Sequence, residues 1–239
     1  MVIDVITQSR SIFFYFVEVC NHQYRFGHDL DSYREIIDMH KKSQNIVELI
    51  RNDTFCEKIY STLEAWNMNQ RGARLQEFGI IKKSLRQHEP YLIDLYKSSL
   101  DSISSLGDED GGKVIRDLDF TFCHLEVMKS KRRIVGVSKT LHFLLPHLVM
   151  PIDSTYTMLH FYGSNKYHDK AEKEFQTFVD IFTKIHRITK QLKLTSSDVD
   201  GEKWNTSIPK LIDNAIIGFD KYMNGHTVDE LKALLAQRD

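Results

Sequence analysis

Residues 131–158 read KRRIVGVSKTLHFLLPHLVMPIDSTYTM and combine helix-forming, turn-forming and reactive side chains. We expect a basic segment to lead into a tight turn at Gly136, because glycine adopts backbone conformations that other residues resist. Ser138 then stands where an N-cap begins a helix, and Pro146 where that helix ends. After a short apolar loop, Asp153 occupies the N-cap position of a further helix.

The remainder of the chain is patterned for helices as well. Apolar residues recur every three or four positions, as in the face shared by Phe55, Ile59 and Leu63, whereas the alternation typical of strands is scarce. Only four prolines and 11 glycines interrupt these patterns. We therefore predict an all-α protein of about ten helices in a two-lobed fold, with a helix-hairpin-helix-like element near residues 129–146.

A chain of 239 residues can bury one sizeable core or two small lobes that share an interface. We expect one helical domain over residues 1–239. If it has two lobes, residues 113–165 hold the hairpin and the active site, and the C-terminal helices cover residues 208–238. The composition, 41% hydrophobic and 27% charged, is that of an ordinary globular protein.

The sequence also indicates in which cellular compartment we expect the protein. No apolar run reaches the ~18 residues needed to span a bilayer, so we predict no membrane association. The three cysteines, Cys20, Cys56 and Cys123, are far apart and form no CxxC pair. This usage is typical of a reducing compartment, and we expect a cytoplasmic protein.

The order of residues in 131–158 resembles the helix-hairpin-helix superfamily of DNA glycosylases. There, a glycine-containing hairpin between two helices holds a phosphate, lyase-active members carry a lysine on the second helix, and an aspartate follows in a P-[IV]-D-[ST] setting. Gly136, Lys139 and Pro151-Ile152-Asp153-Ser154 match in order and kind. Ser138 replaces the second glycine of the hairpin. The resemblance covers about 28 of the 239 residues.

The resemblance implies Asp153 and Lys139 as catalytic residues. A carboxylate beneath the deoxyribose would stabilise the positive charge that develops when the base leaves. A lysine in a partly desolvated pocket can lose its proton and attack the sugar carbon, which gives a Schiff base and strand cleavage.

The resemblance also implies contacts to DNA. The backbone of the hairpin and the basic residues before it would hold the phosphates: Gly136, Val137, Ser138, Lys131, Arg132 and Arg133. The target base must leave the duplex and enter a pocket. Candidates for the wall of that pocket, or for filling the gap in the DNA, are Trp66, Asn69, Arg71, His142 and Tyr156.

We therefore expect a DNA glycosylase, with or without AP lyase activity, that excises a damaged or modified base in repair or in defence against modified phage DNA. DNA is the expected partner. We expect no cofactor and no metal, because the sequence has no HExxH, paired Cys/His, Walker or GxGxxG motif.

The same residues also fit simpler roles. Asp153 suits a helix N-cap, Lys139 an ion-pair partner of Asp153, and Trp66 and Tyr156 the hydrophobic core. The net charge of −1 shows no excess of basic residues, which argues against a large nucleic-acid surface. A non-catalytic DNA-binding module and a helical protein–protein adaptor remain open alternatives.

Overall fold

The fold is all-α, as predicted. The computed structural model describes the chain except for residues 1, 24–27, 44, 71, 165–167 and 239. In this described part there are 13 α-helices, a short π-helix and one 3-10 turn, a few more helices than expected. The excess comes from short helices such as α1 and α10, whose few residues show no periodicity in a sequence window.

The elements follow one another with short connections. In chain order they are α1 (Val2–Ile6), α2 (Arg10–Gln23), α3 (His28–Lys42), α4 (Ile46–Arg51), α5 (Asp53–Ala65), α6 (Phe78–Gln87), α7 (Glu89–Tyr96), α8 (Glu109–His124), α9 (Ile134–Leu144), η1 (Ser154–Met158), α10 (Leu159–Tyr162), α11 (Ala171–Gln191), η2 (Ser196–Asp198), α12 (Ile208–Met223) and α13 (Val228–Arg238). In the described residues, no helix has both the length and the apolar character needed to cross a bilayer.

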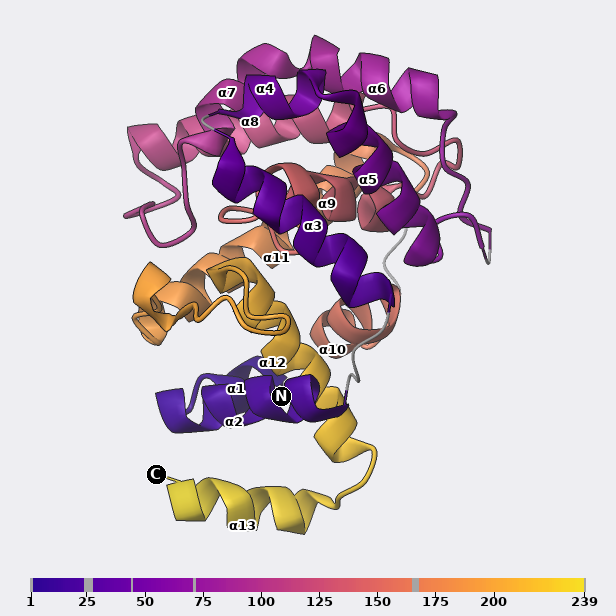
Figure 1. Cartoon of the computed structure of the whole chain (residues 1–239). Helices are drawn as coiled ribbons and strands as arrows, with labels where there is room; N and C mark the ends of the chain where they lie inside the picture. The colour runs from indigo at the N-terminus through magenta and orange to yellow at the C-terminus, as the bar shows by residue number, and fades with distance from the viewer. Residues whose placement is uncertain (1, 24–27, 44, 71, 165–167, 239) are drawn as a thin grey trace.

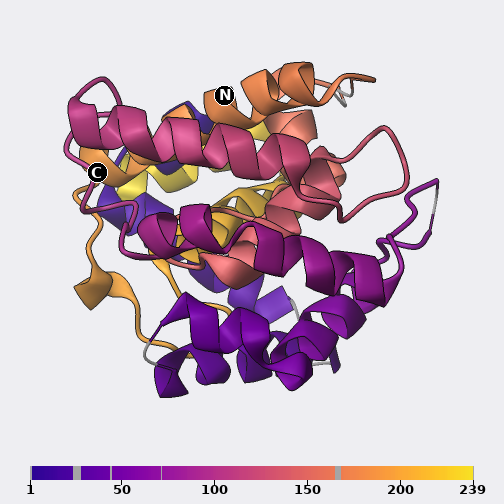
Figure 2. The same ribbon diagram turned by 90° about the horizontal axis from the view of Figure 1, so that it is seen from above.

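The helices gather into two groups at opposite ends of the molecule, with a central region between them. Figure 1 shows α4, α6, α7 and α8 together at one end, and α1, α2 and α13 at the other. The view in Figure 2 looks onto the end that carries α8. Helix α9 lies between the two ends and packs against α5 and α11. Residues far apart in the sequence are thereby brought together around α9.

Helix α9, which carries Lys139, is almost completely buried. Ten of its 11 residues are buried, although Lys139 and His142 are among them. A helix that is buried on all sides places its polar side chains where they need partners within the protein. Lys139 and His142 are therefore each held by a partner within the protein.

A close crossing of α2 and α12 holds the far wall of the same region. Gly218 of α12 faces the backbone of α2, where a Cβ atom would lie 1.8 Å from the carbonyl oxygen of Phe16. Since only glycine fits at this distance, the crossing fixes how deeply α12 enters the core.

The tight turn predicted at Gly136 is wrong. Gly136 lies within α9, which begins at Ile134, whereas the preceding α8 ends at His124. The segment between them forms one bridge, between Met128 and Leu75, and then bends at residues 129–131. Gly136 instead packs against Met128: a Cβ there would lie 2.3 Å from the sulfur, so a larger residue would require this flexible side chain to move.

Candidate functional site

The two residues predicted to be catalytic meet in the structure. The Nζ of Lys139 lies 3.5 Å from Oδ2 of Asp153. Lys139 projects from α9, and Asp153 is the N-cap of η1, as predicted, where its other oxygen accepts from the N–H groups of Thr155 and Tyr156. The N-cap bonds hold the carboxylate in place and leave Oδ2 directed at the amine.

The loop before Asp153 is fastened to α9. Ser138 is not the N-cap expected from the sequence; its hydroxyl accepts a hydrogen bond from the N–H of Ile152 at 3.1 Å. One turn further on, the ring of His142 donates to the carbonyl of Val149 at 2.7 Å. Because both bonds start from the helix that carries Lys139, they set the position of Asp153 relative to the amine.

A cavity opens beside this ion pair. Its volume is ≈ 250 Å³, and Lys139 and Asp153 form part of its wall. Trp66, Trp204 and Tyr156 supply aromatic surface, and α12 supplies further polar groups. The cavity exceeds the ~150 Å³ that suffices for a benzene ring, so a flat heterocycle fits.

A second hollow adjoins the first. It also measures ≈ 250 Å³, and it shares Trp66, Asn67, Lys139 and Asp153 with the first cavity. Arg132 lies on its wall. The Lys139–Asp153 pair therefore lines both hollows. The first is lined by aromatic and polar groups, and the second has a basic residue on its wall.

The amine of Lys139 is strongly desolvated. The residue is 6% exposed, and its Nζ lies 5.3 Å from the ring centre of Trp66. Burial lowers the pKa of Lys139, and the charge of Asp153 opposes that shift. A lowered pKa increases the neutral fraction of the amine, which is the nucleophilic form.

A second ion pair lines the same cavity and was missed in the sequence. The Nζ of Lys210 lies 2.5 Å from Oδ2 of Asp213 and 2.9 Å from Oδ1 of Asn214. Burial raises the pKa of Asp213, and Lys210 opposes the shift. A signal was present: these three polar residues share one face of α12, whose other side chains are mostly apolar and buried.

The predicted pocket residues divide into three groups. Trp66 and Tyr156 line the cavity. Asn69 does not contribute; its amide donates to Glu64 and accepts from the N–H of Leu75, which stabilises the turn after α5. Arg71 lies outside the described residues.

His142 belongs to the core and not to the cavity wall. It is fully buried, and its Nδ1 donates to the backbone while its Nε2 accepts from the hydroxyl of Tyr33 at 2.8 Å. Burial lowers the pKa of His142 to about 3, which keeps the ring neutral. Tyr33 in turn stacks against Trp204 and contacts Trp66, so this polar core supports the aromatic wall.

The phosphate site predicted at Gly136, Val137 and Ser138 has a different structure. The N–H of Val137 is bonded within α9, and the first N–H groups of the helix donate to a carboxylate of this chain. That carboxylate is Glu174 of α11, at 2.8 Å from the nitrogen of Arg133 and 3.1 Å from that of Ile134. The position that an anion takes at a helix N-terminus is thus filled from inside the protein.

The three basic residues before α9 also differ from one another. The guanidinium of Arg133 donates to the carbonyl oxygens of Phe122, Cys123 and Leu125, and so caps the end of α8. Lys131 and Arg132 are exposed. These two stay predicted phosphate contacts, whereas Arg133 has a structural task.

Glu174→Ala is expected to lower the free energy of unfolding by about 2–4 kcal/mol, because it leaves two N–H groups at the start of α9 without an acceptor. Glu174→Gln keeps an acceptor oxygen and should cost less. Urea denaturation measures the change, with Glu172→Ala on the exposed face of α11 as the control. Equal stability of the Glu174→Ala and Glu172→Ala variants would show that this carboxylate does not hold α9.

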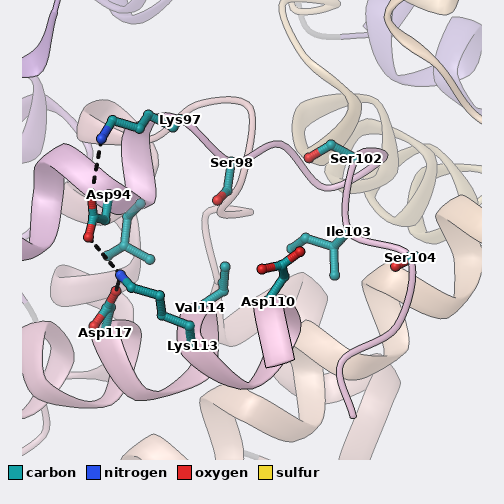
Figure 3. A pocket seen from close by; sticks show the side chains of 11 residues that line it. Asp94, Lys97, Ser98, Ser102, Ile103, Ser104, Asp110, Lys113, Val114 and Asp117 are labelled. Atoms are coloured by element: carbon teal, nitrogen blue, oxygen red, sulfur yellow. Dashed lines mark hydrogen bonds and ion pairs between the residues drawn. The ribbon is translucent and has the colours of Figure 1, made fainter. Parts of the chain in front are cut away.

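A groove of ≈ 330 Å³ lies next to α7 and α8 (Figure 3). Four of its charged side chains pair with one another: Lys113 donates to Asp94 and to Asp117, each at 2.7 Å, and Asp94 also accepts from Lys97. Such exposed pairs have little energetic or chemical consequence. Among the residues described, no group of three His, Cys, Asp or Glu side chains could hold a metal ion.

No protein-family model, curated protein or solved structure matches the chain. The cavity lined by Lys139, Asp153, Trp66, Trp204 and Tyr156, here called the Lys139 cavity, is the strongest candidate for a functional site. Of the hollows described, it combines a desolvated amine, a fixed carboxylate and aromatic walls.

Proposed function

We propose that this chain is a DNA glycosylase with AP lyase activity, and that Lys139 and Asp153 are its catalytic residues. The observation that carries the proposal is the buried amine of Lys139, 3.5 Å from a carboxylate, on the wall of a cavity large enough for a nucleobase. Titratable groups with shifted pKa values in a cavity are typical of active sites.

Energetics favour an enzyme over an adaptor. A buried ion pair adds little net stability, because the loss of hydration offsets the attraction between the charges. Packing alone therefore does not account for the buried amine of Lys139 beside an open cavity. An adaptor with this fold would need Asp153 as the N-cap of η1, but it would not need Lys139.

The proposed reaction uses Asp153 for charge stabilisation and proton transfer, and Lys139 as the nucleophile. The N-glycosidic bond breaks, the base leaves with the electron pair, and the carboxylate of Asp153 stabilises the positive charge left on the sugar. The neutral amine of Lys139 then forms a bond to C1′. The C1′–O4′ bond then breaks, O4′ takes up a proton, and a Schiff base remains between Lys139 and C1′. Removal of a proton from C2′ expels the 3′ phosphate from C3′ by β-elimination. Asp153 is close enough to take the proton that the amine releases.

Contact with DNA is assigned to the exposed basic residues at the second hollow. Arg132 lies on its wall, and Lys131 precedes it in the chain. Because Glu174 fills the N-terminus of α9, we assign no phosphate to that helix. Binding through so few cations should depend only moderately on salt.

Asp153→Asn tests the glycosylase step. DNA treated separately with an alkylating agent, an oxidant or nitrous acid is incubated with the protein, and the released bases are identified by mass spectrometry. We expect release by the unmodified protein, and about 10²–10³-fold less by Asp153→Asn, since charge stabilisation of this kind has that magnitude.

The matched control is Asp108→Asn. Asp108 is also an N-cap aspartate, at the start of α8, but it does not line the Lys139 cavity. Its substitution should leave base release unchanged. If no treated DNA loses a base, or if the two variants behave alike, the assignment fails.

The pH dependence of adduct formation tests the role of Lys139. The rate on abasic-site DNA should rise with pH as the amine loses its proton, with its midpoint below the ordinary lysine value of 10.5, because burial lowers the pKa. Asp153→Asn removes the charge that opposes this shift, so the midpoint should move to still lower pH. A midpoint that moves upward in this variant contradicts the proposed pairing.

A further inference from the structure

The α12 side of the cavity holds an ion pair that the proposed reaction does not use. The side chains of Lys210 and Asp213 are each 6% exposed, yet both residues line the cavity. The amine of Lys210 also lies 5.0 Å from the ring centre of Trp204. Lys139 has the same kind of setting, with Asp153 and Trp66, so the cavity contains two lysines that each face one aspartate and one tryptophan.

This second pair is held rigidly. Asn214 accepts from Lys210 and donates to Asn205 at 3.1 Å, and Asn21 of α2 donates to the same oxygen of Asn205. The close crossing of α2 and α12 fixes the backbones that carry this network. A binding site gains affinity and selectivity when its polar groups are ordered before the ligand arrives.

The pair has bonding capacity left for a ligand. An ammonium group has three N–H bonds, and those of Lys210 are directed at two oxygens, of Asp213 and Asn214. One oxygen of Asp213 accepts from Lys210; for the other, the described residues supply no hydrogen bond. The pair thus offers a donor and an acceptor side by side.

We infer that Lys210 and Asp213 recognise the lactam edge of a nucleobase, that is, a carbonyl oxygen next to a ring N–H. The ammonium donates to the carbonyl, and the carboxylate accepts from the N–H. The inference rests on the proposed function, in which Lys139 and Asp153 hold the sugar and so fix which way round the base lies.

The charge that develops on the leaving base supports this arrangement, in which Lys210 contacts the carbonyl and Asp213 contacts the ring N–H. When the glycosidic bond breaks, the base carries away an electron pair, and a carbonyl oxygen conjugated with the ring takes up part of that charge. Lys210 is placed to stabilise it. Adenine and cytosine present an amino group and an unprotonated nitrogen at this edge, whereas their deamination products, hypoxanthine and uracil, present a lactam. Guanine and thymine also carry a lactam, so the site fits the deaminated bases and separates them from adenine and cytosine, the bases from which they arise.

The tryptophans provide a direct assay. The chain has two, Trp66 and Trp204, and both line the cavity. Their fluorescence is titrated with 2′-deoxyinosine and 2′-deoxyadenosine, and with 2′-deoxyuridine and 2′-deoxycytidine. Each pair of nucleosides differs only at the edge in question. We expect the lactam member to bind about tenfold tighter or more, the discrimination typical of a two-point contact.

Lys210→Met/Asp213→Leu removes both charges and keeps apolar volume in their place, a change that buried pairs usually tolerate. It should abolish the preference. The control, Lys232→Met/Asp229→Leu, removes an exposed pair with the same spacing on α13 and should keep it. The inference is overturned if the unmodified protein binds both members of each nucleoside pair equally, or if its fluorescence responds to none of them. Neither outcome depends on a variant.

The two proposals fail separately. If abasic-site DNA is trapped by borohydride but the nucleosides show no preference, the lactam assignment is wrong and the catalytic assignment stands. If the lactam nucleosides bind preferentially but no DNA loses a base or is trapped, the chain recognises these bases without excising them.

Discussion

Lys139→Gln is expected to reduce borohydride trapping of the protein on abasic-site DNA to background. Trapping requires an amine that forms a Schiff base with C1′, and a glutamine amide does not form one. The buried amine of Lys139 has a pKa lowered by desolvation, so it supplies the neutral form more readily than an exposed lysine. Base release should fall less than trapping, because Asp153 remains.

Two further variants distinguish the role of the Lys139 amine as a nucleophile from the role of its positive charge. Lys139→Arg keeps a cation beside Asp153 but has no nucleophilic amine, so trapping should again be lost. Lys83→Gln removes an exposed lysine of α6 outside the cavity lining and should leave trapping intact. Persistent trapping by Lys139→Gln would assign the chemistry to another amine, with Lys210 the first to examine.

Gly218→Ala is expected to lower the free energy of unfolding by about 3 kcal/mol or more, the upper end of the range for overpacked cores. The added Cβ would lie 1.8 Å from the backbone oxygen of Phe16, which cannot move aside as a side chain can. Either α2 or α12 must shift. Because α12 carries Lys210 and Asp213, nucleoside binding should weaken along with stability.

Gly79→Ala is the matched control. Gly79 also lies in a helix, α6, but a Cβ there meets nothing within 4 Å. Alanine favours the helix by about 0.5–1 kcal/mol over glycine, so this variant should be slightly more stable. Urea denaturation of both variants gives the comparison. A loss of stability in Gly218→Ala no larger than a few tenths of a kcal/mol would show that the two helices are further apart than described.

The spacing of apolar residues along the sequence is sufficient to predict the all-α fold class. Helix α5 is predicted by the repeated apolar face of Phe55, Ile59 and Leu63, and Asp153 is predicted as an N-cap by its place before a helical pattern. The turn at Gly136 was wrong for a reason that no local pattern contains. This glycine has a helical backbone inside α9, and it packs against the side chain of Met128, eight residues earlier.

The candidate site was predicted only where its residues are close in sequence. Lys139 and Asp153 lie on neighbouring elements of one segment, so their order suggested that they meet. Lys210 and Asp213 come from a helix about 70 residues later, and Trp204 from the loop before it, so only the folded chain brings them to the cavity. Glu174, which fills the start of α9, was likewise hidden by its distance in sequence.

The most direct test of the account is to locate the covalent adduct. The protein is trapped on abasic-site DNA with borohydride, digested with nuclease and protease, and the modified lysine is identified by mass spectrometry. We predict the reduced sugar adduct on Lys139. An adduct on Lys210, on several exposed lysines, or on none would contradict the assignment of Lys139 and Asp153 as the reactive centre.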